Sequence, residues 1–321
     1  MLLNIEGLAC HFPVRGLFGR RIGTLRALDG VSFGVAGEEV LGIVGESGCG
    51  KSTLGKTIAG ITRPVAGSVS LAGEQIVAAA AAQVPAARAR LQYVYQDPSA
   101  ALDPRWTLRR SLHEPLQVHT NWSQAQREAK VQEIVAAIGL PEALLDRYPH
   151  ELSGGQQRRM GLARILVLAP QIIIMDEPTT GLDVSVQATV LELLRDLRRA
   201  FKLTYLVISH DIAVLSAMCD RIAVMYLGRI VEIGPTEQVL ANPRHPYTRS
   251  LVASSPRIGG PRLTDNPPRP DEIAAAIDVE RGCRYRMRCP IAKPACATVD
   301  PELAGEGGHD AACLYWDERP S

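Results

Sequence analysis

The chain has 321 residues, of which 46% are hydrophobic, enough for one large globular domain and a smaller unit. Its 35 Lys and Arg nearly balance its 34 Asp and Glu, so charge gives no reason to expect a nucleic-acid partner or an anionic membrane surface. The first seven residues include Glu6 and lack a basic segment followed by an apolar run, so we expect no secretory signal. No stretch reaches the ~18 apolar residues of a spanning helix, so any membrane link should come through partner proteins.

From the first residue to about residue 255, short β-branched runs alternate with helical segments, which predicts an α/β domain with a mostly parallel sheet. We expect strands at 39–44, 92–95, 172–176, 205–209 and 221–225. We expect helices at 51–61, 123–138, 156–168 and 184–200. Five prolines and two glycines between Ser254 and Asp271 predict a linker, so the chain should divide into a domain at 1–255 and a separate small unit at 256–321.

A phosphate-binding loop is predicted directly after the strand at 39–44, where glycines let backbone amides point at an anion. Lys51 should neutralise the phosphates and Ser52 should ligate Mg²⁺. A helix start could also lower the thiol pKa of Cys49, which makes oxidation sensitivity a hypothesis. The alternative to a phosphate-binding loop is a glycine-rich turn that binds no ligand. If the loop does bind phosphate, its pattern alone indicates only that the protein is an NTPase. The residues assigned to the nucleotide are Gly45, Glu46, Ser47, Gly48, Cys49, Gly50, Lys51, Ser52 and Thr53.

Two acids follow the apolar run at 172–175, which predicts a buried strand that delivers both carboxylates at its carboxyl end. Asp176 suits the magnesium shell, and Glu177 is placed to polarise an attacking water. The alternative is a pair of solvated acids in the turn before Pro178.

A second glycine-rich helix start is predicted at 152–158, with Ser153 as its N-cap and two glycines that allow close approach of a ligand. One nucleotide has little use for two such helix ends. We therefore expect this one to face a nucleotide held by another subunit, the alternative being a purely structural turn.

The order and spacing of these three motifs resemble the nucleotide-binding domain of ABC transporters over about the first 255 residues. The resemblance implies a P-loop NTPase fold with a RecA-like core, an antiparallel β subdomain and an α-helical subdomain, with ATP and Mg²⁺ as ligands. It assigns ATP contacts across a dimer to Ser153, Gly154, Gly155 and Gln156, magnesium and water contacts to Gln96, the loop between the two sites to Asp183, a switch role to His210, and adenine stacking to Phe12, with Phe18 as the alternative.

Residues 242–251 resemble the segment that follows this domain in oligopeptide and dipeptide importers, and the long hairpin before residues 27–33 resembles the second of their paired ATPases. The resemblance implies uptake of dipeptides or oligopeptides, driven by ATP-dependent pairing with a paralogous ABC ATPase. Two transmembrane permease subunits and an extracytoplasmic binding protein complete the machine, without nucleic acid. The chain would lie peripherally at the cytoplasmic face of the bacterial inner membrane.

Three other functions stay open at this point. The same machine could import nickel, glutathione or another small solute. A soluble ABC ATPase of DNA repair or translation is the alternative from another class. An ATP-binding sensor with a metal-dependent tail is the third.

Four of the seven cysteines lie in the last 39 residues, at Cys283, Cys289, Cys296 and Cys313. Disulfides are disfavoured in a cytosolic protein, and four thiolates suit a metal. Because members of the peptide-importer subfamily with a similar tail carry a [4Fe-4S] cluster, the resemblance implies one here, with structural Zn²⁺ or free thiols as alternatives. The three arginines between the first two cysteines could offset thiolate charge or form a solvated basic face.

Overall fold

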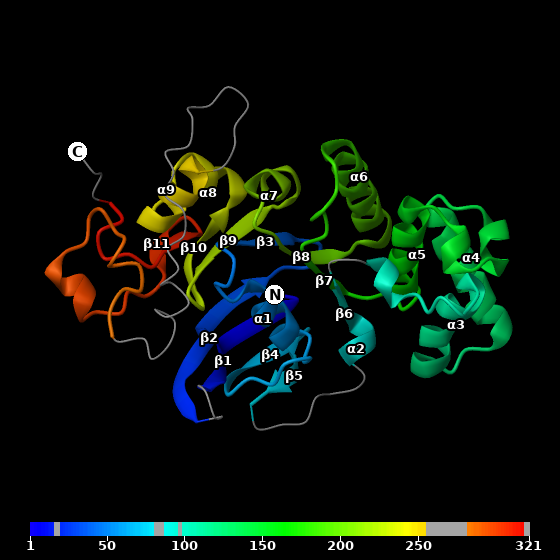
Figure 1. Cartoon of the computed structure of the whole chain (residues 1–321), viewed down its shortest axis with the longest axis horizontal. Helices are drawn as coiled ribbons and strands as arrows, with labels where there is room; N and C mark the ends of the chain where they lie inside the picture. Colours follow the sequence, from blue (N-terminus) through cyan, green and yellow to red (C-terminus); the bar gives the residue numbers. More distant parts are fainter. Residues whose placement is uncertain (16–19, 80–86, 96–97, 255–280, 318–321) are drawn as a thin grey trace. The chain divides into compact units, whose positions relative to one another are not determined.

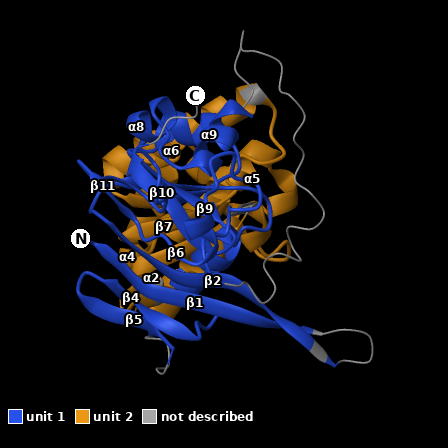
Figure 2. Ribbon diagram, turned by 90° about the vertical axis from the view of Figure 1, so that its left-hand side faces the viewer, with its two compact units in different colours: residues 1–83, 206–321 blue, residues 84–205 orange. Residues whose placement is uncertain are grey.

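The computed structural model describes residues 1–15, 20–79, 87–95, 98–254 and 281–317. The chain divides into two compact units, Met1–Gln83 with Leu206–Ser321 as unit 1 and Val84–Tyr205 as unit 2 (Figure 2). Gln96, Phe18 and nearly all of the predicted linker at 254–271 lie outside the described residues.

Unit 1 contains an antiparallel sheet with the strand order β2-β1-β4-β5. The strands are β1 (Leu3–Arg15), β2 (Arg21–Val35), β4 (Ala66–Leu71) and β5 (Glu74–Ala78). Leu3 and Ile5 alternate with polar residues and are buried, and the irregularity at Gly7, which has φ 55°, returns Leu8 to the buried face. Strands β1 and β2 form the long hairpin that the sequence predicted.

A second set of strands in unit 1 has the order β11-β12-β10-β9-β3 (Figure 1). The set comprises β3 (Val40–Val44), β9 (Arg221–Tyr226), β10 (Arg229–Pro235), β11 (Ala304–Glu306) and β12 (His309–Ala311). Strands β3 and β9 pair in parallel, which confirms the predicted arrangement there. Strand β3 is fully buried, and each such aliphatic side chain contributes about 1.5–3 kcal/mol of transfer free energy.

The helices of unit 1 follow its strands along the chain. They are α1 (Lys51–Ile58), α7 (Ile212–Met218), α8 (Thr236–Ala241) and α9 (Pro246–Ala253). Helix α1 is shorter than predicted because Gly60 takes a left-handed φ of 69° and ends it. Strand β8 (Thr204–Ile208) lies across the boundary between the two units.

The C-terminal segment at 281–317 belongs to unit 1, since β12 pairs antiparallel with β10. Besides the β11–β12 hairpin it contains one short 3-10 helix, Pro294–Ala297. The segment is therefore joined to the unit by backbone hydrogen bonds.

Unit 2 holds the parallel pair β6 (Leu91–Val94) and β7 (Ile172–Asp176), both within three residues of their predicted bounds. Its helices are α2 (Ala87–Arg90), α3 (Leu108–His119), α4 (Gln124–Ala137), α5 (Gly154–Leu166) and α6 (Val184–Phe201), with 3-10 helices at Pro98–Ala101, Glu142–Asp146 and Pro149–Glu151. The leucines at 191, 194 and 197 are buried, as their spacing predicted.

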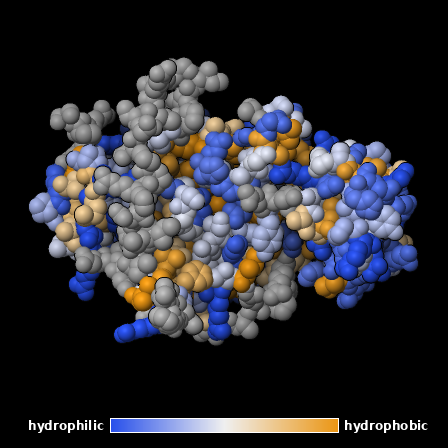
Figure 3. Space-filling view, in the orientation of Figure 1, coloured by the Kyte–Doolittle hydropathy of each residue, from blue (hydrophilic) through white to orange (hydrophobic). Residues whose placement is uncertain are grey.

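Helices α3 and α4 present mostly hydrophilic side chains on the face shown in Figure 3. Across the described ranges, no helix combines the length and apolar character needed to cross a bilayer.

Candidate functional site

The predicted phosphate-binding loop runs from the end of β3 to the start of α1, as the motif requires. Its shape depends on glycine at two positions. A Cβ at Gly45 would lie 2.2 Å from the carbonyl oxygen of Met225, and one at Gly50, where φ is 110°, would lie 2.3 Å from that of Ala27. A backbone hydrogen bond of 2.8 Å from Gly228 to the oxygen of Cys49 also ties the loop to the turn after β9.

The Lys51 side chain is 7% exposed and folds back over its own loop. Its Nζ donates to the carbonyl oxygens of Gly45, at 2.7 Å, and Glu46, at 2.9 Å. The ammonium group is thus held at the opening of the loop beside the start of α1. This is where a phosphate group would take the place of those carbonyl oxygens as its acceptor.

The expectation of a lowered Cys49 pKa is wrong. The thiol is 4% exposed, and burial raises its pKa even though Lys51 lowers it. Desolvation of the thiolate therefore outweighs the nearby positive charge and the helix start. Burial and the raised pKa of this thiol therefore argue against the hypothesis of oxidation sensitivity.

His210 is exposed and follows β8 within unit 1. The preceding Ser209 is buried and its backbone amide donates to the oxygen of Ile43 in β3, at 3.1 Å. The backbone next to His210 is therefore fixed to the strand that leads into the phosphate-binding loop.

In unit 2, Asp176 ends β7 as predicted and Glu177 follows it. The hydroxyl of Tyr93 on β6 donates to Asp176 Oδ2 at 2.6 Å. Burial and the neighbouring carboxylate raise the Tyr93 pKa, so the hydroxyl stays protonated and remains a donor. Sequence reasoning missed this tyrosine because no motif marks it.

Glu177 has a left-handed backbone with φ 56°, which is unfavourable for a residue with a side chain and is found at functional positions. Its carboxylate accepts a 2.7 Å hydrogen bond from the Thr180 hydroxyl. The two acids are therefore held differently, one by a phenol across the strand pair and the other by its own turn.

The second glycine-rich helix start has the predicted N-cap. Ser153 Oγ accepts from the Gln156 backbone amide at 3.4 Å, and Gln156 Oε1 accepts from the Ser153 amide at 3.0 Å, which forms a capping box. Gly154 and Gly155 are exposed and, together with Arg158, Thr180 and other residues of unit 2, line a cavity of about 520 Å³. This helix start therefore opens onto space.

Asp183, at the end of the predicted loop between the two sites, is the N-cap of α6. Its Oδ1 accepts from the Val186 amide at 2.9 Å and from the Ser185 hydroxyl at 2.7 Å. These hydrogen bonds lower its pKa, so the carboxylate stays charged.

Comparisons with known proteins agree with these motifs. Residues 28–180 match the ABC transporter family, and residues 231–296 match the oligopeptide/dipeptide transporter C-terminal region. The oligopeptide transport ATP-binding protein AppF of Bacillus subtilis is 42% identical over 98% of this chain and 97% of its own length. The chain belongs to the ABC transporter family.

Two solved structures have the same fold. CbiO1 of Clostridium perfringens, part of the ABC transporter complex CbiONQ, has a TM-score of 0.64 and 27% identity and covers 75% of this chain and 90% of its own. A dimeric ATP-binding cassette solved with ADP and phosphate has a TM-score of 0.61 and 25% identity and covers 73% of this chain and 98% of its own. The predicted ABC nucleotide-binding fold is confirmed, and ATP-binding proteins of this family hydrolyse ATP.

The segment that suggested an ABC importer at the sequence level has a structural reason for its residues. His245 Nδ1 accepts from the Tyr247 amide at 3.1 Å and so caps α9, while the Glu232 carboxylate accepts from the His245 amide at 2.8 Å. The Tyr247 hydroxyl accepts from the Glu46 amide of the phosphate-binding loop at 2.9 Å. Sequence reasoning recognised this segment without finding its contact with the loop.

The aromatic residue predicted to stack on adenine lies elsewhere than expected. Phe12 was placed after the first strand, but it lies within β1, opposite Leu25 of β2, and its side chain is 39% exposed. An exposed aromatic ring on the hairpin is compatible with stacking, which stays a prediction for this ABC domain.

No three His, Cys, Asp or Glu side chains of the described ranges are arranged to hold a metal ion. The four C-terminal cysteines are free thiols. Burial raises the pKa of the Cys313 thiol to about 11, and the other three thiols of the set raise it further. The donor chemistry therefore fits a metal, while the side-chain positions do not form a ligand set.

The arginines between Cys283 and Cys289 make specific contacts that the sequence did not predict. Arg284 pairs with Asp29 and Arg288 with Glu46, while the Arg286 guanidinium donates to the oxygen of Arg281 at 3.2 Å. Arg284 and Arg288 therefore contact other parts of unit 1, whereas this contact of Arg286 stays within the C-terminal segment.

Proposed function

We propose that this chain is the ATP-hydrolysing subunit of an importer of dipeptides or oligopeptides, in which ATP-driven pairing of two nucleotide-binding domains powers uptake. The observation that carries the proposal is the whole-length similarity to an oligopeptide transport ATP-binding protein together with the matching C-terminal region. This similarity favours transport over a soluble ABC ATPase of DNA repair or translation. Nickel, glutathione or another small solute is the alternative cargo for the same machine.

In the proposed reaction Lys51 neutralises the phosphates of ATP, and Ser52, Asp176 and Gln96 hold Mg²⁺. Glu177 orients the attacking water, assisted by His210. The strained backbone of Glu177 and its hydrogen bond to Thr180 support a fixed orientation of that carboxylate.

The proposed assembly pairs this chain with a paralogous ABC ATPase, two transmembrane permease subunits and an extracytoplasmic binding protein at the cytoplasmic face of the inner membrane. The exposed glycines at the start of α5 support a role toward a nucleotide on the paired ATPase. Within this scheme residues 1–255 form the nucleotide-binding domain and residues 256–321 the extension.

Replacing Glu177 with Gln tests the catalytic role. We expect ATP binding to persist and the steady-state hydrolysis rate to fall by about 100-fold or more, because a water-positioning group is lost. Phosphate release and binding of a fluorescent ATP analogue are measured on the same preparations. Full hydrolysis by E177Q, in a protein that binds ATP, would contradict the role.

Cargo is tested in a bacterial strain that lacks this chain and needs an amino acid supplied only as a peptide. Wild-type chain should restore growth on the peptide and E177Q should not. Nickel and glutathione uptake are measured in the same strains. Restoration of either uptake without growth on peptides would favour the alternative cargo.

We also propose that Cys283, Cys289, Cys296 and Cys313 bind a [4Fe-4S] cluster, which requires their side chains to change position because the thiols do not form a ligand set in the structure. The thiol chemistry and the backbone hydrogen bond from the Cys283 amide to the Cys296 oxygen, at 2.8 Å, support this assignment, with Zn²⁺ as the alternative. Anaerobic purification with iron, sulfide and zinc analysis distinguishes the two. Stoichiometric iron and sulfide that disappear in Cys289→Ser would support the cluster, whereas zinc alone would favour a structural metal.

A further inference from the structure

The phosphate-binding loop contains a carboxylate, Glu46, directly after Gly45. A negative charge in this position opposes the binding of a polyphosphate, because like charges repel strongly where water is partly excluded. The loop therefore needs a compensating positive charge besides Lys51, which lies over the loop carbonyls.

Arg288 of the C-terminal segment supplies that charge. Its Nη1 lies 3.2 Å from Glu46 Oε2 and its Nη2 lies 3.3 Å from Glu46 Oε1, so the guanidinium fork contacts both carboxylate oxygens. The two side chains are 20% and 22% exposed, which limits screening by water.

A buried aromatic cluster supports this arginine. The Arg288 guanidinium lies 5.7 Å from the ring centre of Tyr285, which is 4% exposed. The Tyr285 ring packs against Tyr226, with ring centres 5.3 Å apart, and against Tyr247, with ring centres 5.6 Å apart. The Tyr247 hydroxyl also accepts a hydrogen bond from the Glu46 amide. The backbone of Glu46 therefore contacts this aromatic cluster directly, and its carboxylate contacts the cluster through Arg288.

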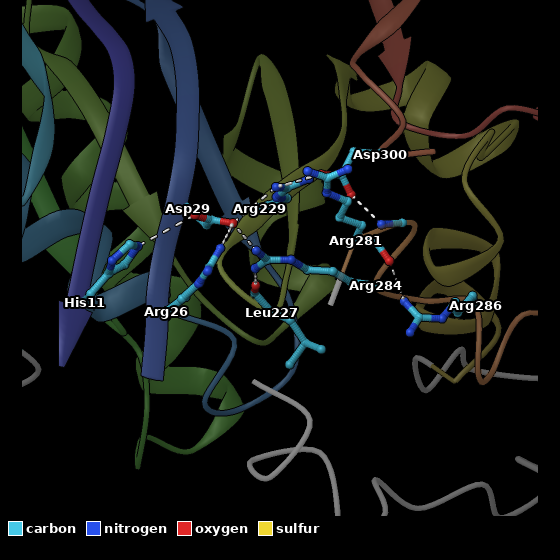
Figure 4. Close-up of polar contacts among 10 residues, drawn as sticks. His11, Arg26, Asp29, Leu227, Arg229, Arg281, Arg284, Arg286 and Asp300 are labelled. Atoms are coloured by element: carbon cyan, nitrogen blue, oxygen red, sulfur yellow. Dashed lines mark hydrogen bonds and ion pairs between the residues drawn. The ribbon is translucent and has the colours of Figure 1, made fainter. Parts of the chain in front are cut away.

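A second contact holds the same C-terminal segment against β2 (Figure 4). Arg284 donates to Asp29 on β2 and to the oxygen of Leu227. Burial raises the Asp29 pKa, but Arg284, Arg229 and Arg26 together hold it below its usual range, so the carboxylate stays charged. Next to Leu227, the Gly228 amide donates to Cys49 of the loop.

We infer that Arg288 is a positioning residue for ATP binding, which acts through Glu46 by neutralising its carboxylate and fixing its place in the phosphate-binding loop. The C-terminal segment thereby sets the affinity of the loop for phosphates. This inference rests on the proposed function, since it concerns the same nucleotide site.

The test compares ATP and ADP dissociation constants of the full-length chain with those of Arg288→Gln. We expect ATP binding to weaken about tenfold and ADP binding less, because the unpaired carboxylate repels three phosphates more than two. The loss should shrink as salt is raised, as a purely structural loosening would not. Arg286→Gln is the matched control for loss of a positive charge from the same segment, where the Arg286 guanidinium donates to the Arg281 oxygen.

Two further variants keep the inference falsifiable if Arg288→Gln is poorly folded. Arg288→Lys should recover part of the affinity, because it keeps the charge without the fork. In Glu46→Gln, adding Arg288→Gln should change the ATP dissociation constant less than about twofold, since the repelling charge is gone.

Three outcomes would overturn the inference. The first is unchanged ATP binding by Arg288→Gln while the wild type binds ATP. The second is an equal loss with and without the Glu46 carboxylate. The third is a wild-type chain that binds no ATP, which would overturn the proposed function as well.

Discussion

The two glycine-rich helix starts of this chain need glycine for different reasons. At α1, Cβ atoms on Gly45 and Gly50 would collide with backbone oxygens of neighbouring elements. At α5, Cβ atoms on Gly154 and Gly155 would meet nothing within 4 Å among the described residues, and neither residue has a positive φ. Packing within the chain therefore explains the first pair and leaves the second unexplained.

This difference indicates what each helix start contacts. The start of α1 is held by Met225, Ala27 and Gly228 of the same unit, so it is preformed for an anion. The start of α5 has its own capping box and faces open space. Glycine there is useful if another molecule approaches the backbone closely, as a nucleotide on a paired subunit would.

The largest expected effect comes from Gly50→Ala. A Cβ at 2.3 Å from the Ala27 oxygen, on a residue with φ 110°, forces the loop to move. We expect ATP affinity to fall by about 1,000-fold, or about 4 kcal/mol, with a lower unfolding temperature. Titration with a fluorescent ATP analogue and thermal unfolding measure both effects. Near-normal affinity would mean that the loop tolerates the shift and that the comparison is wrong.

Gly155→Asp is expected to have a smaller effect, and on the rate of ATP hydrolysis by the paired ATPases rather than on ATP affinity. The added carboxylate lies at a helix start, which favours negative charge, so the unfolding temperature should stay the same or rise slightly. ATP binding to the isolated chain should persist, but hydrolysis by the paired ATPases should fall by about 100-fold, because the acid repels the opposing phosphates.

The control for this variant is Gly139→Asp in the same unit. Gly139 has φ 68° and lies at the end of α4, where a negative charge opposes the helix dipole. It should lower the unfolding temperature without a selective loss of paired hydrolysis. If both variants lost stability and hydrolysis together, the α5 glycines would be structural after all.

The sequence predicted much of this comparison, and its failures have physical causes. Strand β3, α1 and the Ser153 cap depend on local patterns of apolar, glycine and capping residues, so their positions could be read directly. The contacts of Arg288 with Glu46 and of Tyr247 with the Glu46 amide join residues more than 200 positions apart, which no local pattern reports. The predicted lowering of the Cys49 pKa was wrong because burial, which depends on tertiary packing, raises it.

The smallest expected effect concerns His245, which caps the start of α9. That helix start holds the phosphate-binding loop before α1 through Tyr247. His245 is 1% exposed, and burial lowers its pKa from 6.5 to about 4 although Glu232 raises it. Between about pH 4 and pH 6.5, His245 therefore binds a proton in the unfolded chain but stays neutral in the folded chain. The stabilising effect of the neutral imidazole is complete above pH 6.5 and is lost progressively as pH falls toward 4.

Lowering the pH from 7 to 5 should therefore reduce the free energy of unfolding by about 2 kcal/mol through this one residue. Protonation at Nδ1 would also remove the acceptor of the Tyr247 amide and loosen the start of α9 that reaches the phosphate-binding loop. His245→Asn keeps a capping acceptor but does not titrate. Urea unfolding of both proteins at pH 7 and pH 5 measures how much stability each loses. The carboxylates of the chain titrate in both proteins, so their contribution cancels in the comparison. If the wild type and His245→Asn lost equal stability, the imidazole would not be the group that makes this support depend on pH.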